Sequence, residues 1–129
     1  MSMEPSAAVA RVIVTVRGFR AILSSDLAPI YGVQPKVLNQ AVKRNAERFP
    51  PDFAFRLSKD DMTAIRRSRS QSVTLKRGAH VKYAPLAFTE HGALMAATVL
   101  NSRRAVQMSI FVVRAFLRLR EGSSAKPSC

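Results

Sequence analysis

One short stretch of the chain is rich in side chains that can form hydrogen bonds with the polar edges of other molecules. It holds three amides and two lysines: Gln34, Lys36, Asn39, Gln40 and Lys43. An asparagine or glutamine can bind adenine through two hydrogen bonds, and a lysine can donate to guanine, so these residue types suit base edges in the DNA major groove. The alternative is an ordinary solvated helix face, on which the same residue types are common.

The spacing of these residues predicts that they share one face of a helix. On a wheel of about 100° per residue, the polar side holds Lys36, Asn39, Gln40, Lys43 and Glu47. The apolar side holds Val37, Leu38, Ala41, Val42 and Phe49. We therefore expect the apolar side to dock on the protein. Asn45 projects to the apolar side, where we expect it to bind the following "FPPDF" turn.

The residues before this helix predict a short first helix and a tight joint. Ser24, Ser25 and Asp26 favour a helix start. Gly32 favours a stop because glycine adopts the left-handed conformation freely, and Pro35 suits the first position of the next helix. The second helix is expected to end at Arg48 or Phe49, before two prolines. The whole pattern predicts a helix-turn-helix whose second helix, led by Gln34, enters the major groove.

The charge of the chain favours a polyanionic partner. Lysine and arginine number 21 against 8 acidic residues, which gives a net charge of +13 and a pI near 11.4. Double-stranded DNA is the expected partner, ahead of an anionic membrane surface or a merely solvated basic surface. The predicted phosphate contacts are Arg44 and a serine- and arginine-rich segment with Arg66, Arg67, Arg69, Lys76, Arg77 and Lys82. The alternative for that segment is a solvated loop.

The remaining segments predict one small α+β domain with an N-terminal β-hairpin, the helix-turn-helix, further short strands and two packed C-terminal helices. The hairpin is expected from alternating valines at 12, 14 and 16, a turn at Arg17-Gly18 and a strand over Phe19–Leu23. "DFAFRLS" predicts a strand with Phe53, Phe55 and Leu57 inward and Ala54 and Arg56 outward. "VKYAPLAF" predicts a strand at a sheet edge, because of Pro85.

Capping residues and apolar content predict three further helices. Ser58 and Asp61 have capping-box spacing before a helix from about Lys59, and Thr89 caps a helix over Glu90–Leu100. Residues 103–120 are apolar nearly all round, which predicts a buried core helix or else the seam of a homodimer. We expect residues 1–10 to be a flexible leader, 11–121 the domain and 122–129 a disordered tail.

Several classes of protein are not expected. Cys129 is the only cysteine, so no internal disulfide is possible, which fits a reducing cytoplasm. No apolar run reaches the roughly 18 residues of a membrane span, and no signal peptide is evident. The chain has no G-x-x-x-x-G-K, H-E-x-x-H or C-x-x-C motif, so we expect no metal, no cofactor and no enzymatic activity.

Two long runs, "LSSDLAPIYGVQPKVLNQAVKRNAERFPPDFAFRLS" and "YAPLAFTEHGALMAATVLNSRRAVQMSIFVVRAFLRLRE", resemble the ORF-6 N-terminal domain of phage proteins, a relative of the KilA-N and Bro-N domains. The resemblance covers about residues 12–121. It implies DNA binding and a role in prophage antirepressor-like or regulatory proteins. Two departures are Pro29, where a better helix former is expected, and an end at Cys129, where relatives often continue.

The favoured function is sequence-specific DNA binding through the helix-turn-helix, in phage-type transcriptional regulation in the bacterial cytoplasm. The residues expected to contact the bases are Gln34, Lys36, Asn39, Gln40 and Lys43. The alternative is an antirepressor that binds a repressor protein rather than DNA. RNA binding is disfavoured because few exposed aromatic residues are available to stack on bases.

Overall fold

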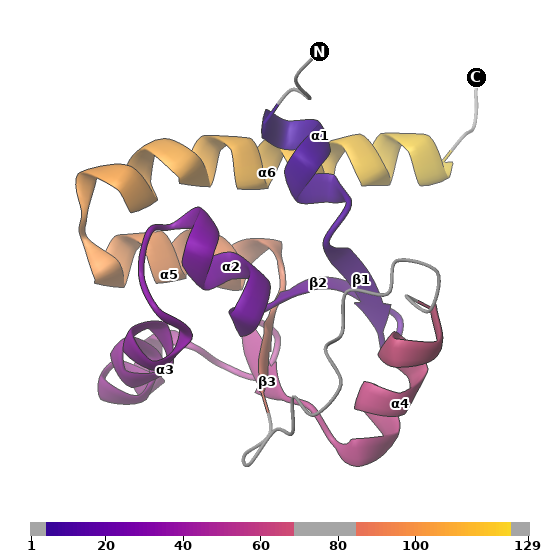
Figure 1. Cartoon of the computed structure of the whole chain (residues 1–129), viewed down its shortest axis with the longest axis horizontal. Helices are drawn as coiled ribbons and strands as arrows, with labels where there is room; N and C mark the ends of the chain where they lie inside the picture. Colours follow the sequence, from indigo (N-terminus) through magenta and orange to yellow (C-terminus); the bar gives the residue numbers. More distant parts are fainter. Residues whose placement is uncertain (1–4, 69–84, 125–129) are drawn as a thin grey trace.

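The computed structural model of the chain describes residues 5–68 and 85–124. These residues form a single α+β domain, as the sequence predicted (Figure 1). In chain order the elements are α1 (Pro5–Ala10), β1 (Ile13–Val16), β2 (Phe19–Leu23), α2 (Ser24–Ile30), α3 (Pro35–Arg44), a 3-10 turn η1 (Ala46–Arg48), β3 (Ala54–Arg56), α4 (Lys59–Ser68), β4 (Leu86–Phe88), α5 (Glu90–Leu100) and α6 (Arg103–Ser124).

The four strands form one antiparallel sheet in the order β1-β2-β4-β3. The β1–β2 hairpin turns at Arg17 and Gly18, which have φ angles of 55° and 83°. Positive φ at both turn residues matches the right-handed twist of the flanking strands, so the predicted hairpin is confirmed. The predicted edge position of the strand after Pro85 is wrong, because β4 lies between β2 and β3. Pro85 precedes the strand, and its carbonyl accepts from the Leu57 amide at 3.0 Å.

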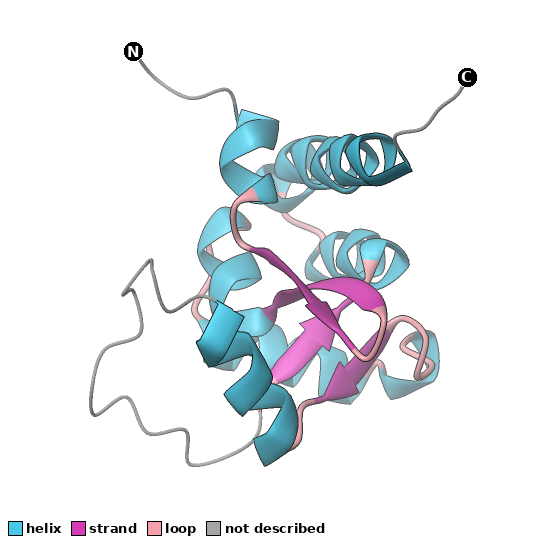
Figure 2. Ribbon diagram, turned by 90° about the vertical axis from the view of Figure 1, so that its right-hand side faces the viewer, coloured by secondary structure: helices cyan, strands magenta, loops and turns pink. Residues whose placement is uncertain are grey.

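Helices cover both faces of the sheet (Figure 2). On one face, Ile22 and Phe88 pack with residues of α2, α3, α5 and α6. On the other face, Ala21 and Ala87 pack with Ile65 of α4. The prediction that Ala54 points outward is therefore wrong: its side chain belongs to the first core and is 8% exposed. Alternation along a strand cannot separate core from solvent when both faces are covered.

Residues 5–10 form a helix, contrary to the flexible leader expected over residues 1–10. Pro5–Ala10 form helix α1, in which Ser6 and Val9 are buried. This helix lies across α6 (Figure 1). Burying Val9 against α6 stabilises a helix too short to persist alone. The C-terminal boundary also differs, since α6 continues through Ser124 rather than giving way to a tail at residue 122.

Helix α6 forms an outer layer of the domain, so the favoured prediction of a buried core helix is wrong. It packs against α5 and α1 through a stripe that includes Ala105, Val112 and Phe116. Val106 and Ile110 are 53% and 52% exposed, and Leu117 is also exposed. No helix among residues 5–68 and 85–124 is long and apolar enough to cross a bilayer.

Candidate nucleic-acid interface

The joint between α2 and α3 is built as the sequence predicted. Gly32 has a φ of 77°, in the left-handed region that favours glycine, and Pro35 occupies the start of α3. The amides of Gly32 and Val33 donate to the carbonyls of Pro29 and Ala28 at 3.0 and 2.9 Å. These bonds close the end of α2 within two residues, so α3 leaves at a fixed angle.

A side chain from the outer helix fixes the same joint from outside. Arg104 donates from Nε to the Ile30 carbonyl at 3.1 Å. A Cβ at Gly32 would lie 2.6 Å from Cδ of Arg104, well inside contact distance. The backbone conformation therefore favours glycine here, and an added Cβ would also have to displace the Arg104 side chain.

The α2–α3 pair is anchored on α5 through a narrow apolar stripe. Leu27, Leu38 and Val42 are buried in the core with the alanines of α5. Tyr31, at the end of α2, is fully buried and donates from its hydroxyl to the Ala93 carbonyl at 2.8 Å. Burial raises the pKa of the Tyr31 hydroxyl far above its ordinary value. The hydroxyl therefore stays a neutral donor, and the helix pair is held by both packing and a buried hydrogen bond.

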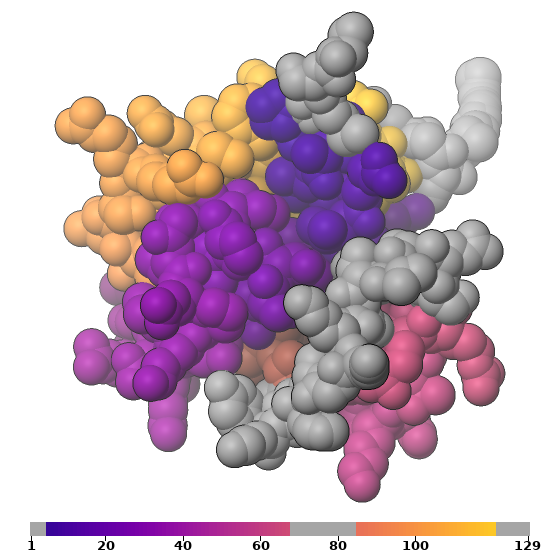
Figure 3. Space-filling view, viewed as in Figure 1, coloured from indigo at the N-terminus to yellow at the C-terminus, as the bar shows by residue number. Residues whose placement is uncertain are grey.

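Most of the predicted base-reading residues are exposed, on α3 or immediately before it. Gln34, Lys36, Gln40 and Lys43 are exposed, and so is Arg44 at the end of the helix. The segment that contains α2 and α3 forms the left flank of the molecule, and side chains project from its lower end (Figure 3). Asn39 differs: it is partly buried, and its Oδ1 is enclosed with no hydrogen-bond partner among the described residues.

The structure corrects the predicted docking face of α3 at Val37. Its side chain is 43% exposed, although the helical wheel placed it with Leu38 and Val42. The stripe of α3 that contacts the core is narrow, and Val37 lies about 100° from Leu38 around the helix. Val37 therefore shares the outward side with Gln40 and Arg44, three and seven residues further along.

The end of α3 also differs from the prediction. The helix ends at Arg44, four or five residues before the expected end, and η1 follows. Asn45 donates from Nδ2 to the Ala41 carbonyl of its own helix at 2.8 Å, not to the "FPPDF" turn. Because η1 redirects the chain, Glu47 does not continue the outward side of α3. Phe49 is buried, and its ring meets that of Phe88 edge-on at 6.2 Å.

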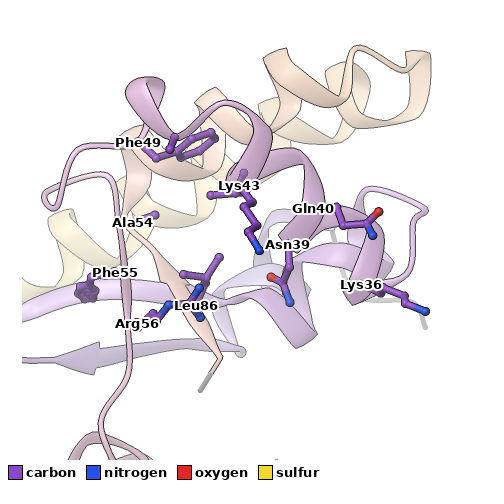
Figure 4. Close-up of a pocket in the computed structure, with 11 residues that line it drawn as sticks. Lys36, Asn39, Gln40, Lys43, Phe49, Ala54, Phe55, Arg56 and Leu86 are labelled. Atoms are coloured by element: carbon purple, nitrogen blue, oxygen red, sulfur yellow. The ribbon is translucent and has the colours of Figure 1, made fainter. Parts of the chain in front are cut away.

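A groove of about 600 Å³ lies between α3 and the end of the sheet at β3. Its apolar lining includes Val42, Phe49, Ala54 and Leu86. Lys43 and Asn39 extend toward it from α3, and Arg56 lies across from them (Figure 4). Lys36 and Gln40 also contribute to its lining, although the ends of their side chains project away. The outward side of α3 therefore borders the groove, and the two surfaces are continuous.

A family model for the ORF6N domain matches residues 11–99. The chain belongs to the ORF6N domain family. The match includes the β-hairpin, α2, α3 and most of α5, and it leaves α1 and α6 outside. It confirms the resemblance seen in the sequence, and it suggests a phage-type regulatory or DNA-binding role. No curated protein and no solved structure matched the chain.

The second basic group of this ORF6N domain is only partly described. Arg66 and Arg67 are exposed, but they belong to the last turn of α4 rather than to a loop. Because α4 packs on the opposite face of the sheet from α3, the structure does not bring these arginines together with Gln40 and Lys36 (Figures 1 and 2). The other predicted phosphate contacts lie outside the described residues: Arg69, Lys76, Arg77 and Lys82.

A charged cluster that the sequence did not predict holds α4 to the hairpin. Arg17 donates from Nε to both carboxylate oxygens of Asp61 at 3.3 and 3.2 Å, and its guanidinium lies 4.9 Å from the centre of the Phe55 ring. The capping box predicted for Ser58 and Asp61 is confirmed by hydrogen bonds of 2.8 and 3.1 Å. The Arg17 hydrogen bond, followed by the Ser58 amide, lowers the pKa of Asp61 to about 2.

Arg17 and Asp61 are 44 positions apart, so no local spacing indicates their contact. Sequence reasoning also placed Val37 on the wrong side of α3, and it did not assign Arg56 to the candidate site. Arg56 was assigned only an outward direction on its strand, and its place across the groove from Lys43 depends on how β3 packs next to α3. In the described parts of the chain, no three histidine, cysteine or acidic side chains lie close enough to hold a metal ion.

Proposed function

We propose that this ORF6N domain binds double-stranded DNA sequence-specifically through α3, as part of phage-type transcriptional regulation. One observation carries the proposal. Helix α3 docks on the core through Leu38 and Val42 and leaves Lys36, Gln40 and Arg44 exposed on the opposite side. A recognition helix needs this division, because the groove-facing side must be both polar and rigidly held.

The proposed contacts follow the position of each side chain. Gln40 binds an adenine edge and Lys36 a guanine edge, because both project from the outward side of α3. Gln34, immediately before the helix, contacts the first base pair that the helix meets. Arg44, in the last turn, binds a backbone phosphate and thereby positions the helix without reading sequence.

Lys43 and Asn39 lie on the flank between DNA and the groove. Lys43 reaches the edge of the major groove from this flank. A base contact by Asn39 requires its amide to turn outward, and the turn releases an enclosed acceptor that has no partner among the described residues. Because an enclosed acceptor without a partner is costly, this rotation is energetically accessible when DNA supplies a donor.

The net charge of +13 supports a strongly salt-dependent interaction with any duplex. Each neutralised phosphate contributes a slope of about −0.9 in log K against log salt. We propose a binding function without catalysis. Selection of bound duplexes from a random pool tests the proposal. A shared sequence motif among the selected duplexes supports it, and retention of duplexes without a motif contradicts the sequence-specific part.

A second function is favoured by the groove beside α3. Its apolar lining with Lys43 and Arg56 at the rim suits an acidic protein segment that inserts an apolar side chain. The corresponding role is that of an antirepressor, which binds a repressor protein and lowers its affinity for its operator. A fall in repressor–operator affinity on adding the chain, while the chain itself binds no DNA, supports this second function over the first.

A further inference from the structure

Helix α3 presents one apolar side chain on the side that the proposed function aims at DNA. The structure describes every residue of α3, and Val37 is its only large aliphatic residue that is exposed, at 43%. The side chain lies in the first turn of the helix. Its outward neighbours, Lys36 and Gln40, are both polar and exposed.

Neither packing nor helix stability accounts for a valine at this position. The side chain is not part of the core, unlike those of Leu38 and Val42. Valine is also a poorer helix former than alanine, lysine or glutamine, because its branched side chain loses rotamer freedom. An exposed valine alone would be unremarkable elsewhere on a protein surface. Here it lies within one turn of Gln40, on a side otherwise suited to base edges.

We propose that Val37 contacts the 5-methyl group of a thymine in the major groove. This inference rests on the proposed function and names the base that one turn of α3 recognises. Thymine is the only normal DNA base with an apolar group in the major groove, and aliphatic side chains recognise it by packing on that methyl. Contact would remove both the valine and the thymine methyl from water, which favours association.

The position of Gln40 sets where the thymine lies in the site. Three residues of helix span about 4.5 Å along the axis, and neighbouring base pairs are about 3.4 Å apart. Val37 and Gln40 therefore contact adjacent base pairs. The preferred duplex has a thymine next to the base pair whose adenine binds Gln40.

The test replaces each thymine of the selected site in turn by deoxyuridine, which lacks the 5-methyl group. Wild type is expected to lose about fourfold in affinity at one thymine, the equivalent of about 0.8 kcal/mol for one methyl-sized group. Val37→Ala is expected to lose about fourfold on the unmodified site and nothing further when that thymine is replaced. Loss of the response to deoxyuridine in the variant is the sign of a direct contact.

Leu94→Ala is the control, because it shortens an exposed aliphatic side chain on α5 rather than on α3. It should keep the wild-type response to deoxyuridine. Unchanged affinity of Val37→Ala, a deoxyuridine response that persists in Val37→Ala, or a selected site without thymine would overturn the inference while leaving DNA binding intact. Failure of wild type to select any motif would instead overturn the proposed function.

Discussion

The outward side of α3 and the last turn of α4 are both basic, yet they differ in composition and in how they are held. Helix α3 combines Lys36 with Gln40 and is held by a buried apolar stripe and by the Tyr31 hydrogen bond to α5. The last turn of α4 presents Arg66 and Arg67 and no amide, on the other face of the sheet. Charge alone attracts any duplex, whereas reading a sequence needs hydrogen-bonding groups held in a fixed place.

The largest expected effect comes from removing the anchor of α3. Leu38→Ala should lower the free energy of unfolding by about 2–5 kcal/mol, because it leaves a cavity where Leu38 is completely buried. Chemical denaturation measures the change. Specific DNA binding should weaken more than random binding at a temperature where the variant is still folded. Gln40→Ala is the control, and a similar loss of stability in it would contradict the assignment of the two sides of α3.

Changing Gly32, in the joint between α2 and α3, should have the next largest effect on stability. Gly32→Ala places a side chain in the left-handed region and against Arg104, so a loss of about 1–2 kcal/mol or more in unfolding free energy is expected. Gly18→Ala is the matched control. It has a similar φ of 83° but no atom within 4 Å of the added Cβ. Thermal unfolding compares them, and an equal loss in both would show that the approach of Arg104 is unimportant.

The contact between Arg17 and Asp61 on α4 should affect the stability of the fold but not the recognition of a DNA sequence. Because the pKa of Asp61 is lowered from 3.8 to about 2, its carboxylate stabilises the fold above about pH 4, and this contribution is lost as the pH falls from about 4 to about 2. Asp61→Asn should remove that part of the pH dependence in denaturation curves. The ratio of specific to random DNA affinity should not change, and a changed ratio would contradict the separation of the two regions.

The smallest expected effect concerns a homodimer. Val106, Ile110 and Leu117 are exposed on α6 at spacings of four and seven residues, which is a stripe along one side of the helix. We propose that this stripe forms a weak seam between two copies on DNA. Sedimentation of wild type at tens of micromolar should then show some species above 14.2 kDa, which Ile110→Glu should abolish. A wild type that is monomeric with and without DNA contradicts the seam.

The elements predicted well from the sequence were those with local signals. Gly32 and Pro35 mark the joint because backbone conformation and a missing amide hydrogen act within one or two residues. The Ser58–Asp61 capping box is equally local. Predictions failed where distant packing decides, as for Ala54, which is buried because helices cover both faces of the sheet. Val9 likewise becomes part of the core only because α6 lies beside it.

The candidate site was predicted in outline for the same reason. The alternation of polar and apolar residues placed Lys36 and Gln40 outward correctly. It could not show that the docking stripe is narrow enough to expose Val37, or that Asn39 turns toward a groove. The exposure of Val37 and the orientation of Asn39 both depend on how closely α3 approaches β3 and α5. The spacing of residues within α3 does not indicate this distance.

The most direct test of the central claim compares one residue from each basic region. Affinities of Gln40→Ala and Arg66→Ala for the selected duplex and for random DNA are measured across a salt series. We predict that Gln40→Ala loses about 1–3 kcal/mol on the selected duplex and almost nothing on random DNA, with an unchanged salt slope. If Arg66 contacts a phosphate, Arg66→Ala weakens both duplexes alike and lowers the slope by about one. An unchanged ratio of specific to random affinity in folded Gln40→Ala would contradict the account, because α3 would then not be the element that reads DNA.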